Sequence, residues 1–167
     1  MKKYRFFVVT LVFSLQAFAQ AGLKKGARAP EFAGKDNYGK TIDLKELLKS
    51  HKAVVLFFYR GQWCPYCNKH IKDLQDSLQL LTARGAYVVG VTPETRDNIN
   101  KTIDKTHASF SIIQDQGYKI MKAYDVNYTV DDALFAKLKS YGVDLDKNNG
   151  NTDHVLPVPA TYVIDKS

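Results

Sequence analysis

The sequence predicts an α/β domain in which helices alternate with the strands of one buried sheet. The apolar runs 53–59 and 86–91 lack polar alternation, as expected of strands buried on both faces. Between them, apolar residues recur every three or four positions from Ile71 to Leu81, the period of an amphipathic helix over 65–83. A final strand, 160–164, follows a proline-rich segment. This order of elements is typical of an α/β sheet with a ligand site at the carboxyl end of its first central strand.

The remaining elements are predicted from turn residues and short apolar periods. In chain order, they are an extended segment at 26–32, a turn at 35–40, a helix at 44–49 capped by Asp43, a helix from Pro93 to about His107, a strand at 111–114 and a helix at 117–124. Residues 127–153 read as an inserted helix and loop. Its helix would begin with a capping box at 129–132 and end at Gly142.

Residues 1–19 have the pattern of a signal peptide. Lys2, Lys3 and Arg5 precede a short apolar region, and Ala17-Phe18-Ala19 is the small-x-small pattern found before a cleavage site. The apolar region is too short for a stable membrane span. We therefore expect an exported protein, periplasmic or extracellular, in which residues 20–167 form one redox domain.

Charge argues against a nucleic-acid partner. The full chain has a formal net charge of +7, but three of its 24 basic residues lie in the leader and none of its 17 acidic residues do. The remaining positive charges are spread along the chain, and no basic run carries interleaved aromatic residues. A solvated surface accounts for this pattern.

The chemistry is concentrated in Trp63-Cys64-Pro65-Tyr66-Cys67, which contains the only two cysteines. The motif lies where the first apolar strand gives way to a helix, so the two sulfurs are able to close a small disulfide ring. The first sulfur then stands at the helix N-terminus, where backbone N–H groups favour a thiolate. These features predict a redox-active pair.

A structural disulfide and a zinc site are the two other interpretations of the cysteine pair. A structural disulfide suits an exported protein, but so short a loop gains little stability from closure. A zinc site usually needs two further ligands, and the four histidines, His51, His70, His107 and His154, form no such cluster. We predict no metal and no other cofactor.

With these motifs the chain resembles the thioredoxin fold, and more narrowly the alkyl hydroperoxide reductase and thiol-specific antioxidant family with its peroxiredoxin-like members. The resemblance runs from 29–32 through 57–67 to 159–165. It implies a thioredoxin-like three-layer sandwich, here without the C-terminal hairpin strand and helix. It also places Pro159 where that fold carries a cis-proline beside the cysteines.

The sequence departs from the usual peroxiredoxin pattern at three places, Arg60, Cys64 and Pro159, and keeps the cysteine at Cys67. The family's proline, hydroxyl residue and peroxidatic cysteine correspond to Arg60, Cys64 and Cys67, and its strand arginine corresponds to Pro159. Two activities therefore compete. A peroxiredoxin-like enzyme would reduce hydroperoxides through a sulfenic acid, which condenses to a disulfide that an external thiol or thioredoxin-like donor reduces. A thioredoxin-type oxidoreductase would exchange with protein disulfides.

Resemblance over the whole chain favours the peroxiredoxin-like assignment. In the thioredoxin-type reading Cys64 is the exposed nucleophile and Cys67 the buried resolving thiol, whereas peroxiredoxin spacing favours attack by Cys67; we expect Cys64 to attack. Arg60, four residues before Cys64, would favour its thiolate. Trp63 would shield the site or contact substrate, and His70, one helical turn after Cys67, could move protons.

A non-catalytic thioredoxin-like binding module is the alternative of another class, and the retained cysteine pair argues against it. The sequence stops at Ser167, three residues after the predicted strand 160–164. We expect strand 160–164 to lie at a sheet edge with an uncovered apolar face. The 167-residue form would then be either part of a longer protein or a species that dimerises or aggregates through this edge.

Overall fold

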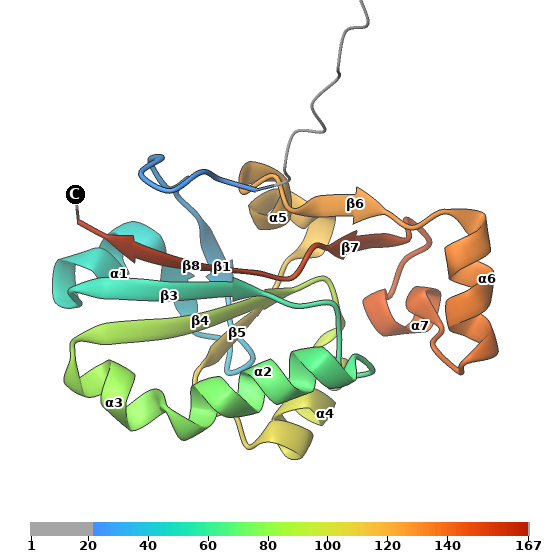
Figure 1. The fold of residues 1–167 in the computed structure, drawn as a ribbon, viewed down its shortest axis with the longest axis horizontal. Coiled ribbons are helices and arrows are strands. Elements are labelled where there is room, and N and C mark those ends of the chain that lie inside the picture. The colour runs from blue at the N-terminus through green and yellow to red at the C-terminus, as the bar shows by residue number, and fades with distance from the viewer. Residues whose placement is uncertain (1–21, 167) are drawn as a thin grey trace, which may run out of the picture.

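The computed structural model describes residues 22–166, and its centre is a four-stranded sheet (Figure 1). The strand order is β5-β4-β3-β8. The strands are β3 (Ala53–Phe58), β4 (Ala86–Thr92), β5 (Ser111–Gln114) and β8 (Ala160–Asp165). The first three are parallel and β8 runs antiparallel to β3. The four predicted strands are therefore present. The predicted leader, 1–19, lies outside the described residues.

Helices cover the two faces of this sheet and give three layers (Figure 1). One face carries the helices that follow β3 and β4; they are α2 (Pro65–Asp76), α3 (Leu78–Ala83) and α4 (Arg96–Thr106). The other face carries α1 (Leu44–Ser50) and α5 (Lys119–Ala123), which follows a 3-10 turn, η1 (Gln116–Tyr118). Two separate apolar clusters fill the spaces between the layers. Within 22–166, no helix is long and apolar enough to cross a membrane.

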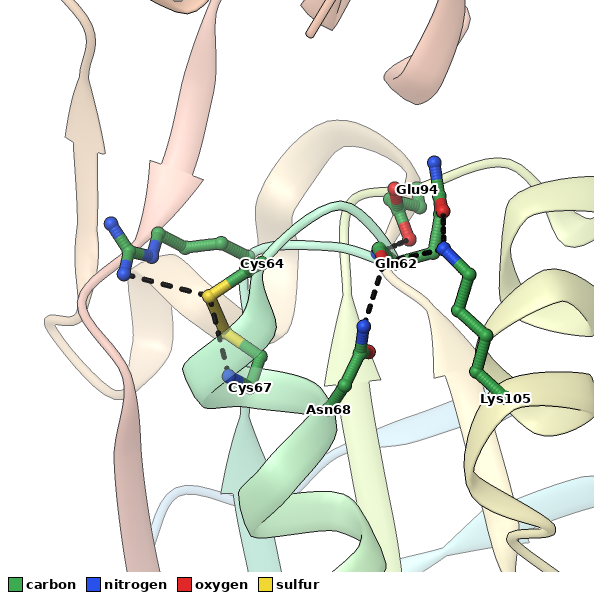
Figure 2. Close-up of a disulfide and its surroundings, with 7 residues drawn as sticks. Gln62, Cys64, Cys67, Asn68, Glu94 and Lys105 are labelled. Atoms are coloured by element: carbon green, nitrogen blue, oxygen red, sulfur yellow. Dashed lines mark hydrogen bonds between the residues drawn. A yellow bond between two sulfur atoms is a disulfide. The ribbon is translucent and has the colours of Figure 1, made fainter. Parts of the chain in front are cut away.

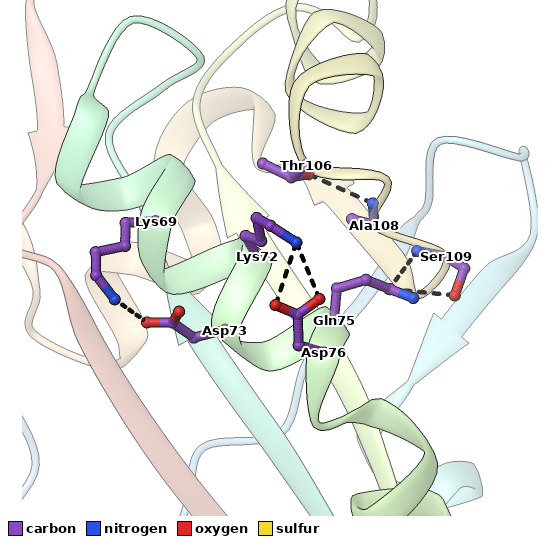
Figure 3. Close-up of polar contacts among 8 residues, drawn as sticks. All are labelled: Lys69, Lys72, Asp73, Gln75, Asp76, Thr106, Ala108 and Ser109. Carbon is purple, nitrogen blue, oxygen red and sulfur yellow. Dashed lines mark hydrogen bonds and ion pairs between the residues drawn. The ribbon is translucent and has the colours of Figure 1, made fainter.

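The predicted helix over 65–83 is two helices. Ser77 separates them with φ −94° and ψ 0°, and no side-chain cap holds the start of α3. The break lies next to Gln75, whose Oε1 accepts hydrogen bonds from the backbone N–H and the hydroxyl of Ser109 beyond α4 (Figure 3). The periodicity of apolar residues does not reveal a hydrogen bond to a distant segment, so the break in the helix was not predicted from the sequence. The outer face of α2 carries the ion pairs Lys69–Asp73 and Lys72–Asp76 (Figure 3).

The chain enters the domain through a short hairpin. It is formed by β1 (Ala33–Lys35) and β2 (Thr41–Asp43), which pair antiparallel. The turn between them is fixed by Asp36, whose Oδ1 accepts from the N–H groups of Tyr38 and Lys40. Asp43 then caps α1 by accepting from Glu46 N–H, as predicted.

The segment predicted as an insertion contains two helices between two short strands. In chain order they are β6 (Asn127–Thr129), α6 (Asp132–Ser140), α7 (Leu145–Asn149) and β7 (Val155–Pro157). Strands β6 and β7 pair antiparallel. The predicted capping box at 129–132 is wrong, because Thr129 belongs to β6 and Asp131 is the cap that accepts from Leu134 N–H. The segment has an apolar cluster of its own around Val130, Leu145 and Leu156.

Strand β8 lies at the edge of the sheet, as the sequence indicated. Its two faces differ. Tyr162 and Ile164 pack into the cluster on the α1 side, so the apolar face there is covered. Val163, on the other face, is 74% exposed. The uncovered apolar surface of this strand is therefore smaller than predicted.

The sheet leaves no room for a side chain at Gly90 in β4. A Cβ there would stand 2.7 Å from Cζ of Phe57, which is fully buried. We expect Gly90→Ala to lower the free energy of unfolding by about 1–3 kcal/mol, because the ring cannot move away in a close-packed core. Urea unfolding followed by circular dichroism measures this. Val163→Ile, which adds a methylene at an exposed position, is the control and should change stability by less than about 0.5 kcal/mol. Equal stability of the two variants would contradict the packing argument.

Candidate redox active site

The two cysteines lie at the point where β3 ends and α2 begins (Figure 2). Cys64 is the N-cap residue of α2 and Pro65 occupies the first turn, where its fixed φ suits a helix and its missing N–H costs nothing. One turn of helix brings Cys67 back to Cys64, and their sulfurs form a disulfide. The predicted redox pair is therefore closed by local geometry.

The surroundings of the Cys64 sulfur favour a negative charge. It accepts a hydrogen bond from the backbone N–H of Cys67 at 3.3 Å, as a helix cap does. A guanidinium nitrogen of Arg60, Nη2, lies 3.6 Å from the same sulfur. When the disulfide is reduced, the helix N-terminus and this cation both stabilise a thiolate at Cys64. Arg60 therefore lies beside this sulfur, and its effect on the thiolate stays a prediction.

Both cysteines are buried in the disulfide, and of the two it is Cys67 that borders a pocket. Cys64 is 1% exposed, whereas Cys67 is 5% exposed and lines a small pocket of about 230 Å³. The prediction of an exposed Cys64 is wrong for this oxidised state, because the N-cap position turns the sulfur inward over the helix. The other pocket residues come from the end of β3, the start of α2 and the start of β8: Phe58, Tyr59, Arg60, Tyr66, His70, Pro159, Ala160 and Thr161.

Pro159 lies in this pocket with Cys67, but the predicted cis peptide bond before it is wrong. The described residues contain no cis peptide bond. The N–H of Val158 donates to Val126 O at 2.7 Å, which carries the β6–β7 pairing up to the residue before the proline. An X-Pro bond also prefers trans by about 0.5–1 kcal/mol. Pro159 therefore shapes the pocket wall through a trans bond.

His70 contributes to the same wall. Its Nε2 lies 3.1 Å from Oγ1 of Thr161 in β8, and its ring meets Phe57 edge to face at 5.8 Å between ring centres. The helix bearing the cysteines is thus joined to the edge strand across the pocket. His70 is within reach of a bound ligand, and the sequence-based expectation that it could move protons stays a prediction.

Trp63 is half-buried and joins two parts of the molecule. It packs against the cluster that contains both cysteines and also against the cluster of the 127–153 segment. The guanidinium carbon of Arg60 lies 5.9 Å from the centre of its ring. Trp63 therefore lies between the cysteine cluster and the 127–153 segment, and its predicted role in shielding the site stays a prediction.

Three contacts that the sequence analysis missed hold the turn between β3 and α2 (Figure 2). Gln62 is their common partner. Its N–H donates to Oε2 of Glu94 at 2.7 Å, and its carbonyl oxygen accepts from Nδ2 of Asn68 at 2.8 Å and from Nζ of Lys105 at 3.1 Å. The turn is thus tied to the loop after β4, to α2 and to α4.

Glu94 was read from the sequence as part of the start of a helix, but α4 begins two residues later. Its side chain is fully buried beneath the turn instead. This burial raises the pKa of Glu94 to about 8, although the hydrogen bond from Gln62 and the charges of Lys105 and Lys101 act in the opposite direction. Its position at the carboxyl end of a parallel strand, next to the strand that leads to the cysteines, is the signal that could have placed it here.

The described residues, 22–166, contain no group of three or more histidine, cysteine or acidic side chains that could hold a metal ion. The site therefore consists of a disulfide, an arginine beside one sulfur, a pocket beside the other and a buried carboxyl below the turn. Its chemistry is thiol–disulfide redox chemistry on an α/β sandwich of thioredoxin type.

The chain belongs to the AhpC/TSA family, whose model matches residues 25–167. Among curated relatives, the sequence is 29% identical over 101 residues to peroxiredoxin Bcp of Bacillus subtilis, covering 60% of this chain and 63% of the relative. It is 33% identical over 102 residues to a putative peroxiredoxin bcp of Helicobacter pylori, covering 61% and 66%. It is 32% identical over 106 residues to chloroplastic peroxiredoxin Q of Populus jackii, covering 64% and 49%. The matches span about half to two thirds of each relative.

Solved structures agree on the fold. Peroxidoxin BcpB of Mycobacterium tuberculosis superposes with a TM-score of 0.64 at 20% identity, covering 87% of this chain and 78% of that one. The thioredoxin domain of a thiol-disulfide oxidoreductase from Bacteroides vulgatus gives a TM-score of 0.53 at 21% identity, covering 61% and 74%. The predicted family and thioredoxin-like fold are confirmed.

The contact between Arg60 and Cys64 is expected to control how fast the Cys64 thiol reacts. In the reduced protein, Arg60→Met should slow alkylation of Cys64 by iodoacetamide at about pH 6–7 by about 3- to 10-fold, because the thiolate loses its nearest cation. Peptide mapping after timed quenching measures the rate at each cysteine. Lys69→Met, a charge removal on the exposed face of α2, is the control and should leave the rate unchanged. If Arg60→Met also leaves it unchanged, the guanidinium does not act on this sulfur.

Proposed function

We propose that this protein is a peroxiredoxin-like, thiol-dependent peroxidase that reduces hydroperoxides through the Cys64–Cys67 pair. The observation that carries the proposal is the closed disulfide at the N-terminus of α2, with a cation on one sulfur and a pocket at the other. Family membership and the similarity to proteins named peroxiredoxins support it.

The oxidative half-reaction begins with the reduced pair. The Cys64 thiolate attacks one oxygen of the peroxide, the O–O bond breaks, and the other oxygen leaves as an alcohol or water after taking up a proton. Cys64 is then a sulfenic acid. The Cys67 thiol attacks its sulfur, water is released, and the disulfide seen in the structure is formed. Two electrons have passed from the two sulfurs to the peroxide.

The reductive half-reaction uses the other sulfur. A donor thiolate entering the pocket meets Cys67, attacks it and forms a mixed disulfide, while Cys64 leaves as a thiolate. Arg60 and the N–H of Cys67 stabilise that leaving group. A second donor thiolate then releases Cys67 and carries away the donor disulfide. An external dithiol or a thioredoxin-like protein supplies both donor sulfurs.

The pocket favours a small substrate. Its volume, about 230 Å³, is below the usual range of sites for drug-sized ligands. Arg60, His70 and Thr161 supply polar groups along a mostly apolar wall. A pocket of this size admits a small hydroperoxide or a donor thiol, and in the oxidised state it borders Cys67, so attack by Cys64 requires the reduced pair to let the peroxide reach that sulfur. We further propose that the protein works outside the cytoplasm, on the basis of the leader-like sequence of residues 1–19.

Variants of each cysteine test both the activity and the order of attack. With excess hydrogen peroxide and a dithiol donor, Cys64→Ser and Cys67→Ser should each lose at least about 100-fold in turnover, because the cycle needs both sulfurs. Cys67→Ser should accumulate a sulfenic acid on Cys64, detected by dimedone trapping and mass spectrometry. Sulfenic acid found instead on Cys67 of the Cys64→Ser variant would assign the first attack to Cys67.

The wild-type protein decides between the two activities. Stopped-flow oxidation of the reduced protein by hydrogen peroxide is compared with its rate of reducing a protein disulfide such as that of insulin. We expect the peroxide reaction to be the faster at equal substrate concentration. A faster reaction with the protein disulfide would make the protein a thioredoxin-type oxidoreductase. If neither reaction occurs, the protein is a non-catalytic binding module instead.

We also propose that copies of the chain associate through β8. The strand is at the sheet edge, Val163 is exposed, and the strand borders a groove of about 990 Å³ with residues 23–29 and α1. Light scattering coupled to size-exclusion chromatography should show a dimer or larger species. Val163→Lys should shift it to monomer, since charge on an edge strand opposes pairing, whereas Tyr38→Lys, at an exposed hydrophobic residue outside β8, should not. A wild-type monomer that unfolds cooperatively would contradict this proposal.

A further inference from the structure

Of the buried polar atoms without a hydrogen-bond partner at the turn that precedes the cysteines, two lie beside Gly61. They are Oε1 of Glu94 and the indole nitrogen, Nε1, of Trp63. Neither has a hydrogen-bond partner within the described part of the chain. Buried polar atoms are usually paired, because an unpaired one has lost its hydrogen bonds to water without replacing them. A donor and an acceptor left unpaired near one another therefore call for an explanation.

Gly61 shows how near the two atoms are. A Cβ at Gly61 would stand 2.5 Å from Glu94 Oε1 and 2.5 Å from Trp63 Nε1, so both atoms lie on the same side of the Gly61 backbone. The absence of a side chain at Gly61 is what permits this approach. The indole N–H, which can only donate, thus neighbours a carboxyl oxygen, which can accept.

The other carboxyl oxygen is already fixed. Oε2 of Glu94 accepts from Gln62 N–H at 2.7 Å, in the turn held by Asn68 and Lys105 (Figure 2). The carboxyl group is therefore anchored at one oxygen, while the second faces the indole. A change of charge on the carboxyl acts on both oxygens, and the indole is the neighbour of the oxygen that has no other partner.

We propose that Glu94 is a positioning residue whose ionisation sets the place of Trp63 over the redox disulfide. When Glu94 is ionised, the indole N–H donates to Oε1, because a charged acceptor makes a stronger hydrogen bond than a neutral one. When Glu94 is protonated, Trp63 is held by apolar packing between the cysteine cluster and the cluster of the 127–153 segment.

The effect reaches the sulfurs through Arg60. The guanidinium lies 5.9 Å from the centre of the Trp63 ring, and its Nη2 is 3.6 Å from Cys64 Sγ. When the indole moves, its contact with the Arg60 guanidinium changes. The position of this cation relative to the Cys64 thiolate then changes as well. This bearing on turnover rests on the proposed function, but the movement of Trp63 does not.

The groups around Glu94 define the pH at which the change occurs. Lys101 and Lys105 face it from α4, and Tyr59 faces it from the end of β3. Burial outweighs the two cations and raises the pKa of Glu94 to about 8. The carboxyl is then mostly neutral at pH 7 and loses its proton as the pH rises through about 8.

Trp63 is the only tryptophan, so its fluorescence reports on this contact directly. The oxidised protein is used without substrate, which keeps the cysteines from titrating and separates this test from the proposed peroxidase activity. Between about pH 6 and 10, wild-type emission should show an inflection near pH 8. Glu94→Gln, which keeps an acceptor for Gln62 but cannot ionise, should abolish it.

Two further variants make the assignment specific. Asp115→Asn removes another buried carboxyl, which accepts hydrogen bonds from the N–H groups of Ile120 and Met121, and should keep the inflection. Lys101→Gln removes a cation that favours ionised Glu94 and should move the inflection to higher pH. Should Glu94→Gln fail to fold, the Lys101→Gln shift still decides. A wild-type emission that is flat over this range, or an inflection that survives in Glu94→Gln, would overturn the proposal.

Discussion

The site depends on the hydrogen bonds that hold one short turn in place. Strand β3 is fixed by its two neighbours in the sheet, and α2 is fixed by its packing on the cysteine cluster. Only the Arg60–Cys64 turn joins them, and Gln62 anchors that turn to three different elements. Because both ends and the middle of the turn are held, the sulfur of Cys64 has one position relative to the helix N-terminus. The electrostatic preference for a thiolate there follows from this position.

The two sulfurs have different surroundings even though one helical turn separates them. Cys64 carries the groups that stabilise a negative charge, and Cys67 borders the space that a partner can enter. In thiol–disulfide exchange, attack is easiest at the accessible sulfur, and departure is easiest for the thiol with the more stable anion. In this site the stabilised anion belongs to Cys64 and the pocket belongs to Cys67. Each cysteine therefore has its own role in exchange with a donor thiol.

Much of this arrangement could be predicted from the sequence. The strands were visible because they are apolar without alternation, and the cysteine pair was visible because its spacing matches one turn of helix. Arg60 was found by its nearness in sequence to Cys64. What the sequence did not reveal are contacts between distant residues. Glu94 lies 32 positions from its partner Gln62. The break at Ser77 lies beside a tether to Ser109.

Errors about Pro159 and Cys64 have a different origin. Both residues were placed in the correct part of the molecule, but details were carried over from the general thioredoxin arrangement. The peptide bond before Pro159 is trans where Val158 continues the pairing of β6 with β7. The exposure of Cys64 was inferred from its role as nucleophile, whereas an N-cap sulfur turns toward the backbone N–H groups that it accepts from. Local hydrogen bonds decided both details.

The 127–153 segment is attached to the sheet domain in a way that would allow it to be replaced by another segment. It leaves and returns through two paired strands, β6 and β7, and it has an apolar cluster of its own. Its contact with the redox site is made through Trp63, and Asn148 O bonds it to the start of α4 by accepting from Thr95 N–H. Replacing the segment between β6 and β7 leaves the four strands of the central sheet and the cysteine turn in place. This part of the chain is the natural place to graft a different segment, and so to alter what surrounds the indole without redesigning the redox pair.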